Sequence, residues 1–237
     1  MKKRWIFDIG MNNGEDTKYY LEKGYNVVAI EANDDLCSIS RNRFSKEIEE
    51  GKLFIINKCL SEDFNSKVTF WINKENNNIS SVDYNWANRY NDSLLSKEVL
   101  TCTLNEIIKE YALPFYIKID IEGADITALK QLKNEAILPQ YISIEDCYLG
   151  YEYIELLNEM SYKKFKLINQ YEIQNSKDQI INFSFSLGSS GKFGDDLDGK
   201  WMDYEEFKIH YENNVRDSKN LTRKAKSNIW WDIHASL

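Results

Sequence analysis

Residues 5–14 read WIFDIGMNNG, a short apolar run that ends in an acid and a turn with two glycines. The apolar run predicts a buried strand, and residues 14–23 have the period of a helix that ends before Gly24. Glycine at a strand-to-helix turn lets the backbone approach a ligand, because no Cβ stands in the way. The stretch therefore predicts a strand, a ligand-binding turn and a helix.

Segments of these two kinds alternate through the first 147 residues of the chain. The main strands are expected at 5–8, 27–31, 53–57, 115–119 and 141–145, with further strands at 67–72, 99–103, 165–169 and 181–185. Helices are expected at 14–23, 33–51, 104–111, 124–132 and 151–160, and residues 73–98 as a polar loop with irregular helix. Because strands that alternate with helices connect by right-handed crossovers, the pattern predicts an α/β fold with a doubly wound, mostly parallel sheet.

Composition and charge restrict the class of protein. The net charge of −8 over 237 residues disfavours a nucleic-acid partner, because binding along a phosphate backbone requires a basic face. No stretch reaches the roughly 18–20 apolar residues that span a bilayer, so no membrane insertion is expected. The apolar run before Asp8 is too short for an export signal, and the four cysteines are dispersed. Both features are typical of a reduced, cytoplasmic protein.

An acid at the end of the second expected strand indicates what the turn binds. Glu31 follows Gly10 by 21 residues, where a carboxylate can accept hydrogen bonds from both hydroxyls of a ribose. A tight turn beside a surface acid is the alternative reading. The pattern D-x-G-x-N-x-G lacks the third glycine of dinucleotide folds, which argues against an oxidoreductase. It looks like the first motif of class I S-adenosylmethionine (SAM) methyltransferases.

Residues 118–125, KIDIEGAD, narrow this likeness further. Together with DIGMNNG at 8–14 and VAIEAN at 28–33, they resemble the FkbM family of SAM-dependent O-methyltransferases. Asn105 and Asp125 depart mildly from the family's usual Asp and Glu. The resemblance implies a Rossmann-like fold, SAM as methyl donor, and a hydroxyl acceptor on a sugar or natural product. It implies these cofactor-binding residues: Asp8, Gly10, Asn12, Gly14, Glu31, Ala32, Cys59, Leu60, Ser81 and Asp120.

The acids after the fourth and fifth main strands are candidate catalytic and metal-binding residues. Asp120 and Glu122 are expected near the transferred methyl group, where a base can deprotonate an alcohol nucleophile. Asp120, Glu145 and Asp146 are expected to share a divalent cation such as Mg²⁺, because oxygen ligands suit that ion. Capping of the following helices is the alternative for all of these acids.

The C-terminal part of the chain has a different composition. After about residue 188 a segment rich in glycine and aspartate precedes a charged, aromatic tail. We therefore predict a SAM-binding domain at 1–187 and an extension at 188–237 that belongs to the same structural domain and closes over the acceptor site as a lid. His234, in WWDIHA at 230–235, is a candidate general base, because an imidazole titrates near neutral pH. A packed, partly buried histidine is the alternative.

These observations predict a SAM-dependent O-methyltransferase that acts on a sugar hydroxyl of a nucleotide-sugar or glycan precursor, in surface polysaccharide biosynthesis. The sugar acceptor follows from the resemblance and not from spacing. A methyltransferase for a non-sugar natural product and a SAM-binding module without turnover are the alternatives. Whether the chain forms a homo-oligomer stays open.

Overall fold

The computed structural model describes residues 4–174, 176–226 and 229–237. Residues 1–3 and 175 of the predicted domain at 1–187 lie outside the described residues, and so do residues 227–228 of the extension. The strands are β1 Trp5–Ile9, β2 Asn26–Ile30, β3 Leu53–Ile56, β4 Cys59–Leu60, β5 Lys67–Asn73, β6 Leu94–Cys102, β7 Tyr116–Ile119, β8 Tyr141–Glu145, β9 Lys164–Asn169, β10 Lys177–Asp178, β11 Phe183–Ser184 and β12 Trp231–Ser236. The helices are α1 Glu15–Glu22, α2 Asp34–Arg43, α3 Ser45–Glu49, α4 Tyr84–Ala87, α5 Leu104–Tyr111, α6 Asp125–Leu132, α7 Gly150–Glu159, α8 Gln170–Ile173 and α9 Tyr204–Asn214, with 3₁₀ turns η1 Asn77–Ile79 and η2 Gly194–Asp196.

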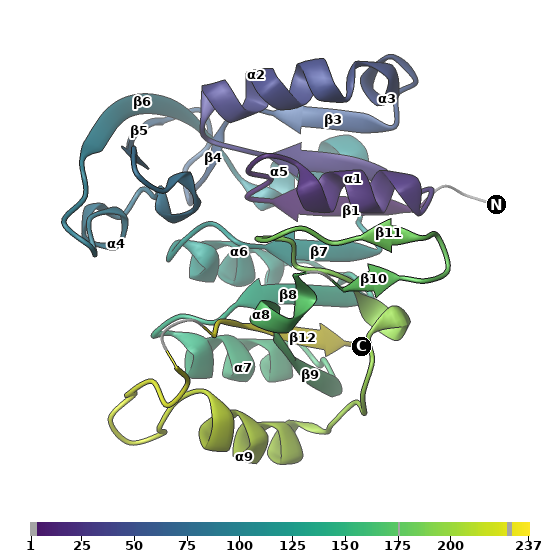
Figure 1. The fold of residues 1–237 in the computed structure, drawn as a ribbon, viewed down its shortest axis with the longest axis vertical. Coiled ribbons are helices and arrows are strands. Elements are labelled where there is room, and N and C mark those ends of the chain that lie inside the picture. Colours follow the sequence, from purple (N-terminus) through teal and green to yellow (C-terminus); the bar gives the residue numbers. More distant parts are fainter. Residues whose placement is uncertain (1–3, 175, 227–228) are drawn as a thin grey trace.

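A seven-stranded sheet in the order β3-β2-β1-β7-β8-β12-β9 forms the centre of the molecule (Figure 1). Within this sheet the neighbouring strands β3, β2, β1, β7 and β8 are parallel, and β12 runs antiparallel to both β8 and β9. The order reverses between β1 and β7, so the carboxyl ends of these two strands form the switch point where ligands bind in such sheets. The predicted doubly wound, mostly parallel α/β fold is confirmed.

Both faces of the sheet are buried, which explains the nearly continuous apolar runs of its strands. One face packs with residues of α5, α6, α7 and α9, and the core there includes Leu104, Leu129 and Phe207. The opposite face packs with α1 and with aromatic residues of 183–193, around Tyr19 and Tyr20. Successive residues of β1 belong to opposite faces because side chains alternate along a strand.

Most predicted elements are present, with boundaries that shift by one or two residues. The predicted helix at 33–51 is instead two helices, α2 and α3. The break falls at Phe44, which leaves the helical region of backbone space and buries its ring beside Gly14. Within the predicted loop at 73–98 the structure has η1, α4 and the beginning of β6, which pairs with β5 as an antiparallel ribbon.

The extension at 188–237 contributes directly to the central sheet. Its last strand, β12, lies between β8 and β9, and Ile233 and Ala235 are fully buried there. The sequence pattern did not predict β12. Since a strand inside the sheet cannot open and close independently, this part of the extension is not a lid. Among the described residues, no helix combines the length and apolar character needed to cross a membrane.

Candidate active site

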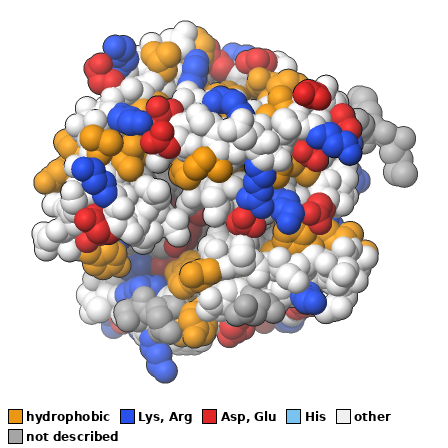
Figure 2. Space-filling model, turned by 45° about the horizontal axis from the view of Figure 1, so that its top comes forward, with side chains coloured by type: hydrophobic (Ala, Val, Ile, Leu, Met, Phe, Trp, Pro, Cys, Tyr) orange, Lys and Arg blue, Asp and Glu red, His pale blue; other side chains and the backbone are white. Residues whose placement is uncertain are grey.

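A cavity of about 660 Å³ lies at the carboxyl ends of β1, β2, β7 and β8. The turn after β1, the acid after β2 and the loops after β7 and β8 all line it. Figure 2 shows a hollow with acidic side chains recessed inside it and hydrophobic and basic side chains around it. The cavity thus occupies the switch point of the sheet, as expected for a ligand site of this fold.

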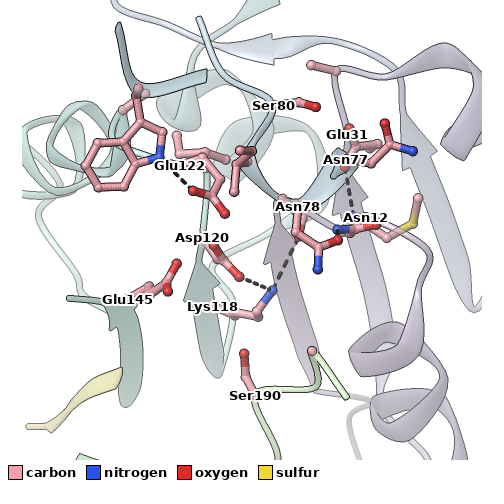
Figure 3. A pocket seen from close by; sticks show the side chains of 18 of the residues that line it. Asn12, Glu31, Asn77, Asn78, Ser80, Lys118, Asp120, Glu122, Glu145 and Ser190 are labelled. Carbon is pink, nitrogen blue, oxygen red and sulfur yellow. Dashed lines mark hydrogen bonds and ion pairs between the residues drawn. The ribbon is translucent and has the colours of Figure 1, made fainter. Parts of the chain in front are cut away.

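The turn after β1 and the acid after β2 meet at one end of the cavity (Figure 3). Glu31 is 8% exposed and accepts hydrogen bonds from the backbone N–H groups of Asn12 and Asn33, both at 2.8 Å. Burial raises the pKa of Glu31, and these two N–H groups oppose that shift. The carboxylate is therefore held in one orientation, and it retains lone pairs for ligand hydroxyls.

The predicted cofactor-binding residues divide into two groups. Seven of them line the cavity: Gly10, Asn12, Glu31, Ala32, Cys59, Leu60 and Asp120. The other three, Asp8, Gly14 and Ser81, do not line the cavity. The Asp8 carboxylate accepts a hydrogen bond of 2.6 Å from the Thr17 hydroxyl, and the Ser81 hydroxyl donates to the backbone carbonyl of Glu122 at 2.7 Å. Their predicted direct contact with the cofactor remains a prediction.

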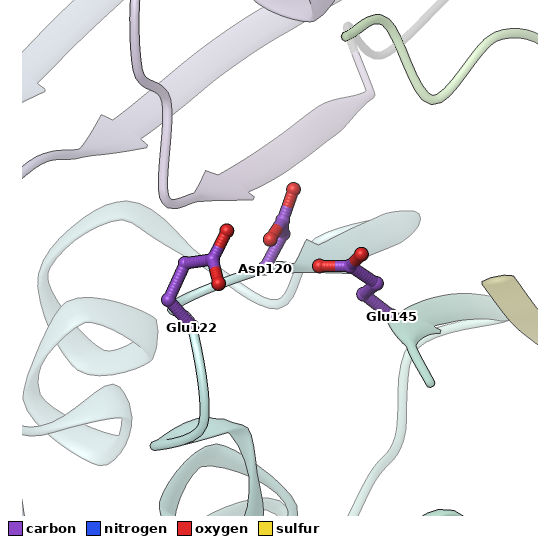
Figure 4. Close-up of side chains that lie close together, drawn as sticks. All are labelled: Asp120, Glu122 and Glu145. Atoms are coloured by element: carbon purple, nitrogen blue, oxygen red, sulfur yellow. The ribbon is translucent and has the colours of Figure 1, made fainter. Parts of the chain in front are cut away.

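Three carboxylates converge at the other end of the cavity. Oxygen atoms of Asp120, Glu122 and Glu145 all lie within 4.8 Å of one another, from the loop after β7 and the end of β8 (Figure 4). We call these residues the acidic triad. Like charges at this separation repel, so the triad favours a proton or a cation between its members.

Glu122 is held by several contacts in an unusual backbone conformation. Its φ of 54° lies in the left-handed region, which is costly for a residue other than glycine. Its carboxylate accepts hydrogen bonds from the Trp86 indole at 2.7 Å and from Arg89 at 3.2 Å. Burial and the neighbouring Asp120 raise the pKa of Glu122 to about 8, although Trp86 and Arg89 oppose the shift. Glu122 therefore exchanges a proton near neutral pH.

The predicted metal ligands Asp120, Glu145 and Asp146 are not all brought together. Asp146 instead forms an ion pair of 2.8 Å with Arg216 and accepts a hydrogen bond from the Tyr211 hydroxyl. Successive residues of a strand point to opposite faces, so Glu145 and Asp146 separate at the end of β8. Glu122 takes the third place in the triad, so this cluster differs from the predicted set of ligands, which stays a prediction.

His234 lies inside the sheet and not at the cavity. It is 1% exposed in β12, between Ser143 of β8 and Lys166 of β9, and it is absent from the cavity lining. Burial, together with Lys166, lowers its pKa to about 3. His234 does not line the cavity, so its role as general base stays a prediction that this position does not favour.

Other residues of the extension do reach the cavity. Residues 188–190 line it together with the preceding Leu187, and the backbone N–H of Ser190 donates to both carboxylate oxygens of Asp16, at 2.9 and 3.1 Å. Asp232, two residues before His234, also lines the cavity and is buried. The extension therefore contributes to the site through a loop and through Asp232.

Sequence reasoning missed three residues that shape the site. Lys118 is the first residue of the KIDIEGAD segment at 118–125, and a lysine inside a buried strand is a signal for a charged site. Trp86 and Arg89 lie in the Asn-rich segment at 73–98, where no periodicity marks them. Arg89 also packs over the Trp86 ring, 4.5 Å from its centroid.

Several solved structures have a low level of similarity to this chain. No curated protein sequence matches the chain. The solved structures that are similar include an FkbM methyltransferase from Methylobacillus flagellatus, with 15% identity, a TM-score of 0.47 and coverage of 70% of this chain. The chain spans only 40% of that protein. The C-terminal domain of a precorrin-6Y C5,15-methyltransferase from Rhodobacter capsulatus has 9% identity and a TM-score of 0.46, covering 100% of this chain and 82% of its own.

A match to a family model covers most of the region that forms the cavity. The model of the methyltransferase FkbM domain matches residues 8–167, which extend from β1 through the turn, Glu31 and the acidic triad to β9. This match confirms the resemblance found in the sequence motifs. The chain belongs to the FkbM methyltransferase family.

Proposed function

We propose that the protein is a SAM-dependent O-methyltransferase whose acceptor is a sugar hydroxyl. The observation that carries the proposal is a single cavity with Glu31 at one end and the acidic triad at the other. The carboxylate of Glu31 suits the ribose hydroxyls of a nucleoside cofactor. The carboxylates of the acidic triad suit the deprotonation of an alcohol. Family membership makes SAM the expected methyl donor.

The residues at the first end fit SAM. Glu31 presents a fixed carboxylate to the ribose hydroxyls, and apolar side chains including Ile30, Leu36 and Phe70 line the cavity for the adenine. Acidic groups deeper in the cavity suit the positive charge of a sulfonium. Bound SAM supplies the methyl group that is transferred.

We assign the deprotonation of the acceptor hydroxyl to Glu122, with Asp120 beside it. A general base works best when its pKa lies near the working pH, and the pKa of Glu122 is raised to about 8. Trp86 and Arg89 keep its carboxylate in place without shielding it from the cavity, which Glu122 lines. Transfer also requires the acceptor oxygen to be positioned against the methyl carbon.

Aromatic side chains at the cavity support a sugar as acceptor. The aromatic side chains that line it are Trp86, Tyr90, Tyr148 and Trp230. Aromatic rings stack on the C–H faces of sugars, and carboxylates accept hydrogen bonds from sugar hydroxyls. We propose a nucleotide-sugar or glycan precursor, used in surface polysaccharide assembly in the cytoplasm. A non-sugar natural product remains the alternative acceptor.

We also propose that the acidic triad takes a divalent cation such as Mg²⁺. Three carboxylates supply hard oxygen ligands, and a cation would relieve their mutual repulsion. A cation there would also lower the pKa of an acceptor hydroxyl.

Two measurements test the function. Calorimetry with S-adenosylhomocysteine tests the cofactor, and we expect binding at one site per chain. Mass spectrometry of reactions with deuteromethyl-labelled SAM and a library of sugars, nucleotide sugars and non-sugar alcohols tests the acceptor, and we expect labelled methyl ethers of sugars. Binding without turnover on any acceptor would favour a SAM-binding module, and absence of binding would reject the proposal.

A further inference from the structure

Lys118 is a buried lysine at the centre of the sheet. It lies on β7, with β1 on one side and β8 on the other, and is only 4% exposed. Taking an ammonium group out of water costs free energy unless charged groups and hydrogen-bond acceptors replace the water. A lysine at such a position therefore needs specific partners.

Three carboxylates and one carbonyl surround its ammonium group. The Nζ atom lies 3.6 Å from Asp8 Oδ1, 3.5 Å from Asp16 Oδ2 and 3.3 Å from Asp120 Oδ2. It also donates a hydrogen bond of 3.3 Å to the Gly10 carbonyl. One cation thus joins β1, α1 and the loop after β7.

The three acids depend on Lys118 to different degrees. Asp8 also accepts from the Thr17 hydroxyl, and Asp16 also accepts from the Ser190 backbone. Among the residues that the structure describes, Lys118 alone lies within ion-pair or hydrogen-bond distance of the Asp120 carboxylate. Asp120 also faces the repulsion of Glu122 and Glu145 in the acidic triad, so Lys118 opposes its displacement.

The contact with Asp16 extends this role to the C-terminal extension. Asp16 is buried in α1, and both of its oxygens accept the backbone N–H of Ser190. Residues 187–190 line the cavity, and this hydrogen bond attaches them to α1. A change at Lys118 would therefore reach the cavity from two sides, through Asp120 and through Asp16.

We propose that Lys118 is a positioning residue, which holds Asp120 within the acidic triad and, through Asp16, holds residues 187–190 against the cavity. The inference rests on the proposed function, because the place of Asp120 affects a rate only if the triad acts on an acceptor. The arm through Asp16 can be tested without an acceptor.

A double-mutant cycle tests the arm through Asp120. We expect Lys118→Met to lower kcat about 10²-fold, the scale of loss when reacting groups are misplaced by about 1 Å. In the background of Asp120→Asn the same substitution should lower kcat by only about threefold, because the route through Asp120 is already lost and only the route through Asp16 remains. Two effects that multiply would show that Lys118 acts on kcat independently of Asp120, and would overturn this arm.

Amide hydrogen exchange, followed by mass spectrometry on the full chain, tests the arm through Asp16. Lys118→Met and Asp16→Asn should each accelerate exchange in peptides that cover 187–190. The comparison with wild type is made under conditions in which the variant and wild type have equal free energies of unfolding. Lys166→Met is the matched control, because Lys166 is 3% exposed but donates to the Leu197 and Asp198 carbonyls instead. Asp16→Asn decides the question if Lys118→Met does not fold.

The outcomes separate the two proposals. If wild type binds S-adenosylhomocysteine but the variants at Lys118 and Asp16 exchange at 187–190 like Lys166→Met, the positioning role is overturned and the function stands. If the variants accelerate exchange there but wild type does not bind S-adenosylhomocysteine, the positioning contact is supported and the proposed function fails.

Discussion

Gly10 and the backbone carbonyl of Asp120 lie in direct contact, so that a Cβ on Gly10 would overlap the Asp120 oxygen. The φ of Gly10 is +86°, a conformation that favours glycine. A hydrogen bond of 2.9 Å from the Asp120 N–H to the Ile9 carbonyl holds the same junction. The glycine turn and the acidic motif are therefore two sides of one junction between β1 and β7.

Gly10→Ala should destabilise the protein by about 2 kcal/mol or more, because it adds an overlap to the backbone strain. Gly24→Ala is the control, since Gly24 has a similar φ of +87° but open space around its Cβ position. It should cost only the strain, about 1 kcal/mol. Urea unfolding of both variants measures the difference, and equal losses would contradict the contact.

Glu31→Ala should weaken SAM binding by about 1–3 kcal/mol, the range for losing charge-assisted hydrogen bonds. Titration calorimetry measures the affinity, and Glu49→Ala, at an exposed acid on α3, is the matched control. An affinity equal to that of the control variant would remove Glu31 from the ribose site.

The raised pKa of Glu122 predicts how stability depends on pH. Its folded-state pKa of about 8 exceeds the usual 4.5, so the folded protein binds this proton more tightly than the unfolded chain does. The contribution of Glu122 to stability is therefore present below about pH 4.5 and is lost as the pH rises through about 8. Glu122→Gln should make this decline shallower in urea unfolding at pH 5, 6.5 and 8, whereas Glu49→Gln should leave it unchanged.

A chelator should abolish turnover without abolishing the binding of S-adenosylhomocysteine, if the acidic triad holds a cation. Glu145→Gln should weaken Mg²⁺ binding measured by calorimetry. Asp146→Asn should instead lower the melting temperature, because it breaks a buried pair with Arg216. Full activity in excess chelator would leave the triad with a proton-transfer role only.

His234→Ala should lower the free energy of unfolding by about 2–4 kcal/mol, since it empties a buried position in β12. The kcat of the folded fraction should stay within about threefold of wild type, because the side chain does not line the cavity. A catalytic base would behave oppositely, with a kcat loss of about 10²–10⁴. Unfolding curves and initial rates on one preparation distinguish the two.

The sequence alone determined the parallel core and the end of the cavity at which Glu31 lies. Apolar runs identified β1, β2, β7 and β8 because strands buried on both faces have no polar alternation. Gly10, Glu31 and Asp120 were predicted because each lies at a strand end, and parallel strands bring such ends to one edge of the sheet. These features depend on local sequence and on a fixed handedness of crossover.

Only the tertiary structure decided the antiparallel insertion of β12 and the membership of the acidic triad. Nothing local in residues 231–236 indicates that they pair with β8 and β9, which are far away in the chain. That pairing buries His234 and brings Asp232 to the cavity. Glu122, and not Asp146, is the third member of the acidic triad. The backbone of Glu122 is itself in the left-handed region, after β7 ends. Asp146 lies on the opposite face from Glu145, because side chains alternate along β8, and it pairs with Arg216. Which partners these side chains meet, such as Arg216 for Asp146, depends on long-range packing, which spacing in the sequence does not encode.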